Sequence, residues 1–306
     1  MKYRAIILST LLIVNIRYAQ SIEKPPVLSN NSIASRNDNN FNKNEVKIRF
    51  AAYNVLFGLW GTPESIGNNL KKYNLDIVCF NEVPDGNWTK RVGKILKMNH
   101  YHVGKISSAN HKDKYKSILS RFPLYDVGEI EVNAKGWKPA SLVYARTKIK
   151  DVNLRLYSTH IPGQQNPTGS AAAFIANNII KDNTDDNLII LGDLNNKPNN
   201  GALKSFDNFQ ITSIWAELEI DTSKNSTHKH IESGTESGVI DHIYFQSNQH
   251  KVTVKKGGII YDAFNDPKTD IDMPRYKKEW IKHKKPLSDH RPIWAEFIFS
   301  TDNSKK

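Results

Sequence analysis

The chain has 306 residues and a formal net charge of +12. Its hydrophobic content of 39% and aromatic content of 10% exclude a disordered chain and indicate a folded core. A strongly basic surface attracts phosphate-bearing partners such as nucleic acid or anionic lipid, without identifying which. The only cysteine is Cys79, which excludes an internal disulfide.

Residues 1–20 are typical of a secretory signal peptide. Lys2 and Arg4 form a positively charged start, and Ala19-Gln20 precedes a plausible cleavage point. The apolar stretch between them, 6–16, is short for a membrane span, although an uncleaved membrane anchor is the alternative. The sequence therefore predicts an exported protein, secreted or periplasmic, with no stable membrane span after cleavage.

An asparagine-rich segment follows at 21–45. Such a polar stretch buries too little apolar surface to offset the entropy lost on ordering, so we expect a disordered linker. One folded domain is expected over 46–299, with a short tail at 300–306.

The first half of this domain alternates strands with two helices. A strand is predicted over 46–57, with Asn54 near its end, and Thr62-Pro63 has the pattern of a helix start. A second buried strand over 76–83 ends in Asn81 and Glu82, before Pro84 stops it.

Further elements follow the same pattern of strands that end in polar side chains. The apolar pattern predicts a helix whose apolar face lies within Trp88–Leu96, followed by short strands at 101–107 and 117–119. It also predicts a hairpin of 140–149 with 152–160, and the second strand of this hairpin ends at His160. A helix over 168–181 leads into the apolar strand 188–191.

That apolar strand runs into Gly192, and then into Asp193 and Asn195. An acid and an amide two residues apart point to the same side of an extended chain, and their oxygens suit Mg²⁺ or Mn²⁺. The alternative is a strand followed by an Asx-type turn, because Asp and Asn favour turns.

Three more strands complete the domain, at 239–245, 252–261 and 293–299. The first carries Asp241, and Asp289-His290 precede the last. His242 is expected to face away from Asp241 in a regular strand. Helices are few and strands are many, which favours two packed sheets with outer helices over the regular alternation of a doubly wound parallel sheet.

The ordered segments YNV, NEV, ILSRFP, STH, GDLN, IDHIYF and SDHRP resemble the endonuclease/exonuclease/phosphatase superfamily, which has the DNase I-like fold. They cover nearly all of 46–299. The resemblance implies an α/β (α+β) four-layer sandwich, in which two packed mixed β-sheets are flanked by helices. It also implies hydrolysis of phosphate esters with Mg²⁺ as the cofactor and Mn²⁺ as the alternative ion.

The resemblance also assigns a metal site. Glu82 is expected to be the principal Mg²⁺ ligand, with Asn54 and Asp289 nearby. Arg121, which closes the ILSR segment, is a candidate substrate contact, and a structural ion pair is its alternative. Each metal candidate could also be a plain strand-end or loop residue, because isolated motifs often mislead.

The remaining matched residues are expected to be catalytic. Asp193 would orient or deprotonate the attacking water, and Asn195 would hold Asp193 or a phosphate oxygen. His290 would contact the phosphate, oriented by Asp241 in a carboxylate–imidazole pair. His160 would donate a hydrogen bond to the phosphate.

Two further features have competing interpretations. His228 and His230 could hold Zn²⁺ from one strand face, but without matched partners they fit a substrate-side loop better. The basic run 275–285, interleaved with Tyr276 and Trp280, fits contact with a nucleic-acid backbone or a solvated helix face.

The leading hypothesis is an exported, metal-dependent phosphodiesterase that acts on nucleic acid, which the basic charge favours. The alternatives are a phosphatase, a sphingomyelinase-like phospholipid phosphodiesterase and a non-catalytic binding module. A phosphate-ester substrate, no protein partner and a monomer are expected. The cysteine pair of secreted DNases is absent from the sequence.

Overall fold

The computed structural model describes residues 45–181, 185–230, 233, 235–261 and 286–300. The predicted signal peptide, nearly all of the predicted linker and the basic run 275–285 lie outside these residues. No helix among the described residues is long and apolar enough to cross a membrane.

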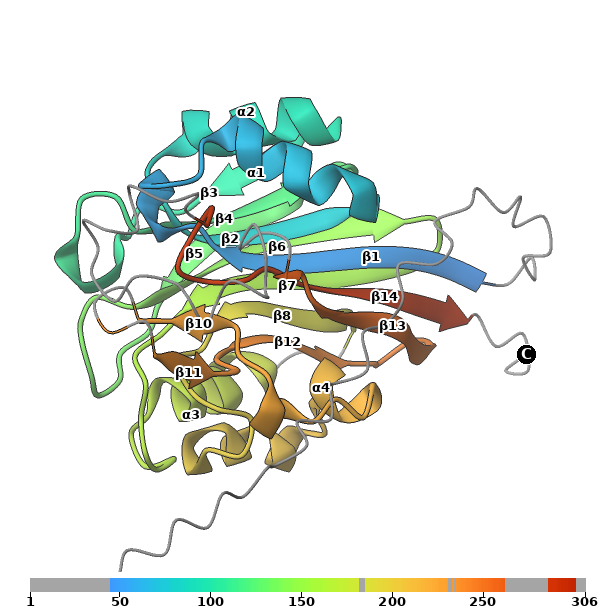
Figure 1. The fold of residues 1–306 in the computed structure, drawn as a ribbon. Coiled ribbons are helices and arrows are strands. Elements are labelled where there is room, and N and C mark those ends of the chain that lie inside the picture. Colours follow the sequence, from blue (N-terminus) through green and yellow to red (C-terminus); the bar gives the residue numbers. More distant parts are fainter. Residues whose placement is uncertain (1–44, 182–184, 231–232, 234, 262–285, 301–306) are drawn as a thin grey trace, which may run out of the picture. The chain divides into compact units, whose positions relative to one another are not determined.

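Two large sheets form the centre of the folded unit (Figure 1). The first sheet has the spatial order β13 (Lys251–Ile259), β14 (Ile293–Ser300), β1 (Glu45–Asn54), β2 (Ile77–Val83), β4 (Tyr115–Ser120) and β3 (His100–Val103). The second has the order β5 (Tyr125–Glu131), β6 (Ser141–Ile149), β7 (Val152–His160), β8 (Asn187–Asp193), β12 (Asp241–Gln246) and β9 (Thr212–Ser213). A small ribbon pairs β10 (His228–Lys229) with β11 (Glu236–Gly238).

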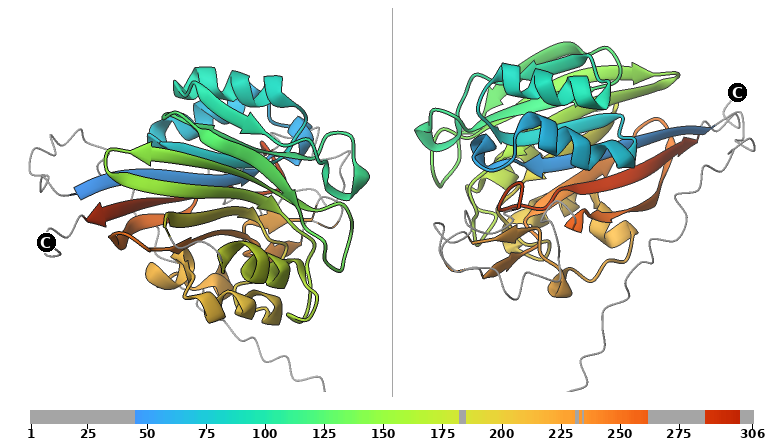
Figure 2. Two further views of the ribbon diagram at one scale, coloured as in Figure 1. Left: turned by 180° about the vertical axis from the view of Figure 1, so that it is seen from behind. Right: turned by 45° about the horizontal axis from the view of Figure 1, so that its top comes forward.

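Helices cover the outer faces of both sheets (Figures 1 and 2). The α-helices are α1 (Pro63–Leu70), α2 (Gly86–Leu96), α3 (Ala171–Ile175), which continues as the π-helical turn η4 (Ala176–Ile180), and α4 (Ile214–Glu217). Short 3₁₀ turns are η1 (Leu56–Gly58), η2 (Lys71–Tyr73), η3 (Ser108–Asn110), η5 (Gly201–Ser205), η6 (Asp207–Phe209) and η7 (Thr222–Lys224). The molecule thus has the predicted four-layer sandwich of two mixed sheets flanked by helices.

The main core lies between the two sheets. The rings of Phe50 on β1 and Phe245 on β12 each approach Phe297 on β14 with centroids 5.1 Å apart. All seven residues of β2, and all seven of β8, are buried. Because both of their faces are covered, these strands read as continuous apolar runs and do not alternate.

The helix starts follow from local sequence. Thr62 caps α1 by accepting a hydrogen bond from the backbone N–H of Ser65, and Pro63 occupies the first helical position, as predicted. Ile66 and Leu70, four residues apart, are both buried against the first sheet. The helix predicted over 168–181 begins later than expected, after Ser170, which caps α3.

The main strand predictions were confirmed, but β5 and the short strands β9 and β11 were missed. The hairpin of β6 and β7 pairs along its whole length, from Ser141 opposite His160 to Ile149 opposite Val152. Strand β5 was not predicted. It lies at the edge of its sheet and is mostly exposed, so its residues lack an apolar pattern.

Candidate active site

The two sheets bring their polar strand ends to one place through parallel pairing. Strand β1 runs parallel to β2, with Asn54 opposite Asn81, and β7 runs parallel to β8, with His160 opposite Asp193. Strand β12 is antiparallel to β8, so its first residue, Asp241, also lies opposite Asp193. The carboxyl ends of four strands and the start of a fifth therefore meet.

Asp193 lies at the centre of the resulting cluster. Its Oδ2 accepts a hydrogen bond from the Asn54 side-chain amide at 3.1 Å, and its backbone N–H donates to Asn81 Oδ1 at 2.8 Å. The Nε2 atoms of His160 and His290 lie 3.5 and 3.6 Å from the same Oδ2. A nearly completely buried carboxylate is thus held between an amide and two imidazoles.

His290 is paired with Asp241, as the sequence predicted. The Nδ1 atom of His290 lies 2.8 Å from Asp241 Oδ2, and both side chains are buried. Burial alone lowers the pKa of His290, but the carboxylates of Asp241 and Asp193 outweigh it and raise the pKa to about 10. His290 is therefore an imidazolium at neutral pH.

Burial and nearby charges also shift the pKa values of Asp193 and His160. Burial raises the pKa of Asp193 to about 7; Asp241 adds to this effect and the His290 charge opposes it. Burial, followed by the nearby cations Lys116 and Lys114, lowers the pKa of His160 well below its usual value. The site thus combines a neutral imidazole, a charged imidazole and a carboxyl group that titrates near neutrality.

Glu82 occupies a strained position at the end of β2. Its φ of +53° lies in the left-handed region, which is uncommon for a residue with a side chain. Oε1 lies 3.1 Å from Lys114 Nζ and 3.7 Å from His160 Nε2. Oε2 is buried and has no hydrogen-bond partner among the described residues, so this oxygen is available to a water molecule or a cation.

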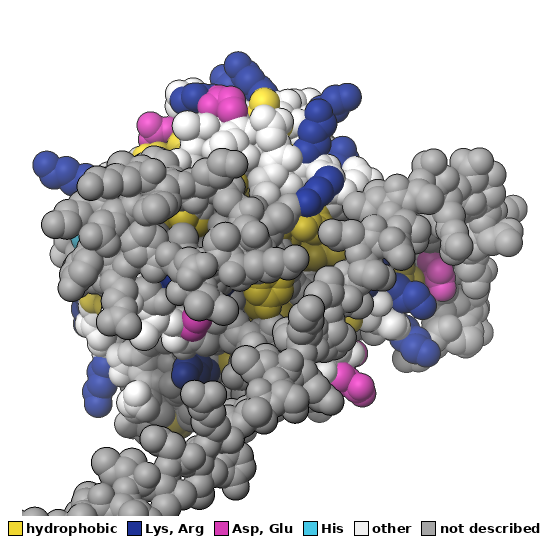
Figure 3. Space-filling view, viewed as in Figure 1, with side chains coloured by type: hydrophobic (Ala, Val, Ile, Leu, Met, Phe, Trp, Pro, Cys, Tyr) yellow, Lys and Arg dark blue, Asp and Glu magenta, His cyan; other side chains and the backbone are white. Residues whose placement is uncertain are grey.

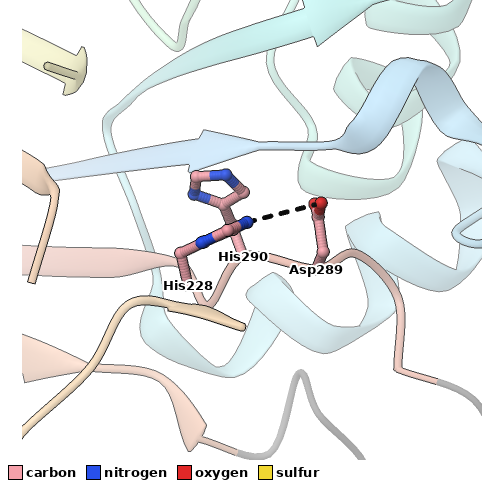
Figure 4. A group of neighbouring side chains, drawn as sticks. All are labelled: His228, Asp289 and His290. Carbon is pink, nitrogen blue, oxygen red and sulfur yellow. Dashed lines mark ion pairs between the residues drawn. The ribbon is translucent and has the colours of Figure 1, made fainter. Parts of the chain in front are cut away.

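Asp289 lies in the turn before β14, beside two histidines (Figure 4). Its Oδ2 is 3.6 Å from His228 Nε2, and its Oδ1 lies 3.2 Å from Ser288 Oγ. Ser288 also donates to the backbone carbonyl of Asn54, which ties this turn to β1. Burial favours a high pKa for Asp289, but His228 and His290 outweigh it and lower the pKa.

Two residues depart from the expected roles. Asn195 leaves the extended conformation, with a φ of +51°, and its backbone N–H donates to Asp193 Oδ1 at 2.8 Å. This is the Asx-type turn that was the alternative for this segment. The Asn195 side chain donates to the carbonyl of Ile161. The side-chain amide that holds the Asp193 carboxylate is therefore that of Asn54 and not that of Asn195.

Arg121 does not reach the cluster, which corrects its assignment as a substrate contact. Its guanidinium pairs with Asp76 at 3.3 Å and donates to the carbonyl of Leu75. Asp76 directly precedes β2, whereas Glu82 lies near the other end of that strand, about 20 Å away at the usual rise per residue. Arg121 therefore forms the structural ion pair that was its alternative.

Three site residues were not identified from the sequence, and a fourth, His228, was considered only together with His230. Lys114 contacts Glu82, Asn81 fixes the backbone of Asp193, Ser288 links β1 to the turn, and His228 contacts Asp289. Asn81 and Ser288 lie inside the matched motifs and could have been found there. Lys114 directly precedes β4 and His228 lies in the short strand β10, and their partners Glu82 and Asp289 are distant in sequence.

The sequence matches a family model described as the Endonuclease/Exonuclease/phosphatase family, over residues 51–290. The chain belongs to this family. It is therefore a member of a family of phosphoester hydrolases, and the strand-end cluster lies within the matched residues. A comparison with curated proteins found no match.

Solved structures of this family share the fold. A family protein from Bacteroides thetaiotaomicron is 17% identical, with a TM-score of 0.62, and the match covers 86% of this chain and 98% of the other. A mannosyl-6-phosphatase from the same organism is 16% identical, with a TM-score of 0.58 and coverage of 82% and 99%. D. rerio TDP2 complexed with a single-stranded DNA product is 15% identical, with a TM-score of 0.55 and coverage of 82% and 98%.

Proposed function

We propose that this family member is a Mg²⁺-dependent phosphodiesterase whose substrate is nucleic acid. The observation that carries the proposal is the buried Asp193 carboxylate, which is contacted by Asn54, His160 and His290 at the ends of paired strands. Hydrolysis of a phosphodiester requires an activated water and neutralisation of charge on the phosphate, and this cluster has groups suited to both.

The residues at the end of β2 fit a divalent metal ion. Glu82 has a buried oxygen without a hydrogen-bond partner among the described residues, and Asn54 and Asp289 offer further oxygen atoms from adjoining segments. Hard oxygen ligands of this kind suit Mg²⁺, and Mn²⁺ as the second choice. Bound there, the ion would supply Lewis-acid polarisation of the phosphate.

Asp193 is the candidate general base. A pKa of about 7 places this carboxylate where it is ionised at slightly alkaline pH and still basic enough to accept a proton from water. The Asn54 amide and the Asn195 backbone N–H hold its two oxygens in a defined orientation. Asp193 would thus both orient the attacking water and receive its proton.

The two histidines would bind the phosphate group. His290 carries a positive charge, and its Nδ1 is taken by Asp241, so Nε2 is the atom that can donate to a phosphate oxygen. His160 packs against Trp137 with ring centroids 5.1 Å apart, which limits its rotation. As a neutral ring it can donate one further hydrogen bond.

Nucleic acid is favoured over other phosphodiesters by charge. The net charge of +12 gives attraction to a polyanion at long range. On the face shown in Figure 3, Lys and Arg side chains of the described residues are scattered around the rim and do not form one patch. The charge therefore supports attraction to the phosphate backbone of nucleic acid in general and indicates no preference for a particular nucleotide sequence.

The test is hydrolysis by the purified protein, with and without Mg²⁺ and at several salt concentrations. The panel contains plasmid DNA, RNA, bis-p-nitrophenyl phosphate, p-nitrophenyl phosphate and sphingomyelin. Metal-dependent cleavage of nucleic acid that weakens with salt is expected. Cleavage of the monoester or the lipid alone would replace the nuclease with a phosphatase or a phospholipid phosphodiesterase.

Two variants tie the activity to the site. Asp193→Asn is expected to abolish turnover, whereas Asp221→Asn, which changes an exposed aspartate that caps a 3₁₀ turn, should leave it intact. Binding of DNA without turnover under any metal condition would instead support a non-catalytic binding module.

A further inference from the structure

We propose that His228, Asp289 and His290 form a binding site for a borderline transition-metal ion such as Zn²⁺, and that the ion inhibits hydrolysis. The site shares Asp289 with the oxygen ligands proposed for Mg²⁺ and differs from them in its two imidazoles. Figure 4 shows the three side chains converging from the turn before β14 and from β10.

The geometry is close to that of a metal centre. One ligand atom from each of the three residues lies within 4.8 Å of the others, and His228 Nε2 is 3.6 Å from Asp289 Oδ2. Bonds of about 2.0–2.1 Å to a tetrahedral ion place the ligand atoms about 3.3 Å apart. Closing the site therefore requires the ligand atoms to approach one another by up to about 1.5 Å.

Both imidazoles are already oriented by a second contact. Nδ1 of His228 lies 2.6 Å from Ser237 Oγ, and Nδ1 of His290 lies 2.8 Å from Asp241 Oδ2. In metal sites, the histidine nitrogen that does not bind the ion is almost always held by a carboxylate, a carbonyl or a similar partner. Nε2 is thus the atom of each ring that remains to bind a metal.

Backbone contacts hold the two ligand-bearing segments together. His228 and His290 form an antiparallel bridge, and the backbone N–H of Lys229 donates to the carbonyl of Asp289 at 3.0 Å. The Arg291 guanidinium pairs with Glu236 through two 2.9 Å hydrogen bonds, which fastens β11, the strand that carries Ser237. The ligands therefore keep their relative positions without the ion.

The ligand chemistry selects the ion. Two imidazole nitrogens and one carboxylate oxygen suit Zn²⁺ and Co²⁺, whereas Mg²⁺ prefers oxygen ligands. An ion at this site occupies Asp289 and His290 Nε2, and therefore removes both residues from their proposed roles in hydrolysis. Zn²⁺ should therefore inhibit, and Mg²⁺ should compete with it for Asp289.

The experiment measures binding directly, by titration calorimetry with Zn²⁺ and by the visible absorption of bound Co²⁺, on tag-free protein. One site is expected in the parent protein. His228→Gln should weaken the site by about 100-fold, because one of three ligands is lost. The matched control His230→Gln, which changes an exposed ring that contacts His228, should bind as the parent does.

A second variant covers the case in which His228→Gln fails to fold. Ser237→Ala keeps all three ligands and removes the partner of His228 Nδ1, so a loss of about 10–100-fold in affinity is expected. Equal Zn²⁺ affinity in the parent and both site variants, or loss of binding in His230→Gln, would overturn the proposal. So would the absence of a Zn²⁺ site in the parent.

Inhibition is a separate readout, and it rests on the proposed hydrolytic function. Zn²⁺ should inhibit turnover of a substrate from the hydrolysis panel, raised Mg²⁺ should relieve the inhibition, and His228→Gln should be less sensitive than His230→Gln. If the protein hydrolyses nothing in that panel, calorimetry still decides whether the site exists. A Zn²⁺ site without inhibition would retain the site and reject its inhibitory role.

Discussion

His290 Nδ1 and Asp241 Oδ2 lie 2.8 Å apart in the interior of the protein. The two residues are 49 positions apart in the sequence, and Asp241 lies opposite Asp193 on the neighbouring strand. The charge on His290 is therefore stabilised by a buried carboxylate that is itself fixed by sheet register. The protonation state of the site depends on this pair.

Asp241→Asn should lower kcat/KM by about 10²–10⁴-fold, because the imidazolium of His290 loses its main stabilising charge. The pKa of His290 should fall from about 10, and NMR titration of its ring resonances would measure the change. Unfolding should remain cooperative, since the hydrogen bond from the Asp241 backbone N–H to Thr227 is unaffected. Activity within a few-fold of the parent would contradict the proposed role of the pair.

Lys114→Met should strengthen the apparent affinity for Mg²⁺ by about 5-fold, the equivalent of about 1 kcal/mol. The Lys114 ammonium lies 3.1 Å from Glu82 Oε1 and competes with a metal ion for that carboxylate. Methionine keeps most of the apolar stem and removes the charge. Activity measured as a function of Mg²⁺ concentration gives this apparent affinity. An unchanged or lower apparent affinity for Mg²⁺ in the variant would argue against Glu82 as a metal ligand.

Gly192→Ala should destabilise the fold by about 2–3 kcal/mol, because no side chain fits at this position. Gly192 has a φ of +140°, and an added Cβ would lie 2.0 Å from the carbonyl oxygen of Thr159. Gly86→Ala is the matched control, since its added Cβ would meet only Val103, at 3.8 Å. Urea denaturation would compare the two, and equal stability would refute the argument.

His242→Gln should make the protein less sensitive to acid. Burial lowers the pKa of His242 to about 4, against about 6.5 in an unfolded chain. Between these values the unfolded state binds more protons, so the free energy of unfolding falls as the pH falls from 6.5 towards 4. The variant should therefore lose about 2 kcal/mol less than the parent between pH 7 and pH 5.

Glutamine at position 242 can preserve the hydrogen bond of His242 to the backbone carbonyl of Asn196. His242 Nε2 lies 2.7 Å from the Asn196 carbonyl, and a glutamine amide can donate to the same oxygen. The free energy of unfolding would be measured in urea at both pH values. Parallel losses in the two proteins would show that His242 does not contribute to the acid sensitivity.

Several relationships in the site could not be read from the sequence. The Asn195 side chain was expected to point to the same side of the strand as Asp193. Because Asn195 adopts a left-handed conformation, its backbone N–H, and not its side chain, donates a hydrogen bond to Asp193. Arg121 lies in a matched motif, yet its partner Asp76 precedes the start of β2, whereas Glu82 lies near the end of that strand. His228 had been considered with His230, whereas the structure supplies Asp289 and His290 as its neighbours.

The sequence by itself determined the order of the main strands, the helix start at Thr62-Pro63 and the residues Glu82, His160, Asp193, Asp241 and His290 at strand ends. These depend on local patterns of apolar and polar residues, which a chain carries whatever its tertiary structure. Only the tertiary structure decided which polar groups meet. Contacts such as Asn54 with Asp193, Lys114 with Glu82 and His228 with Asp289 join residues 32 to 139 positions apart, and register and packing set their distances.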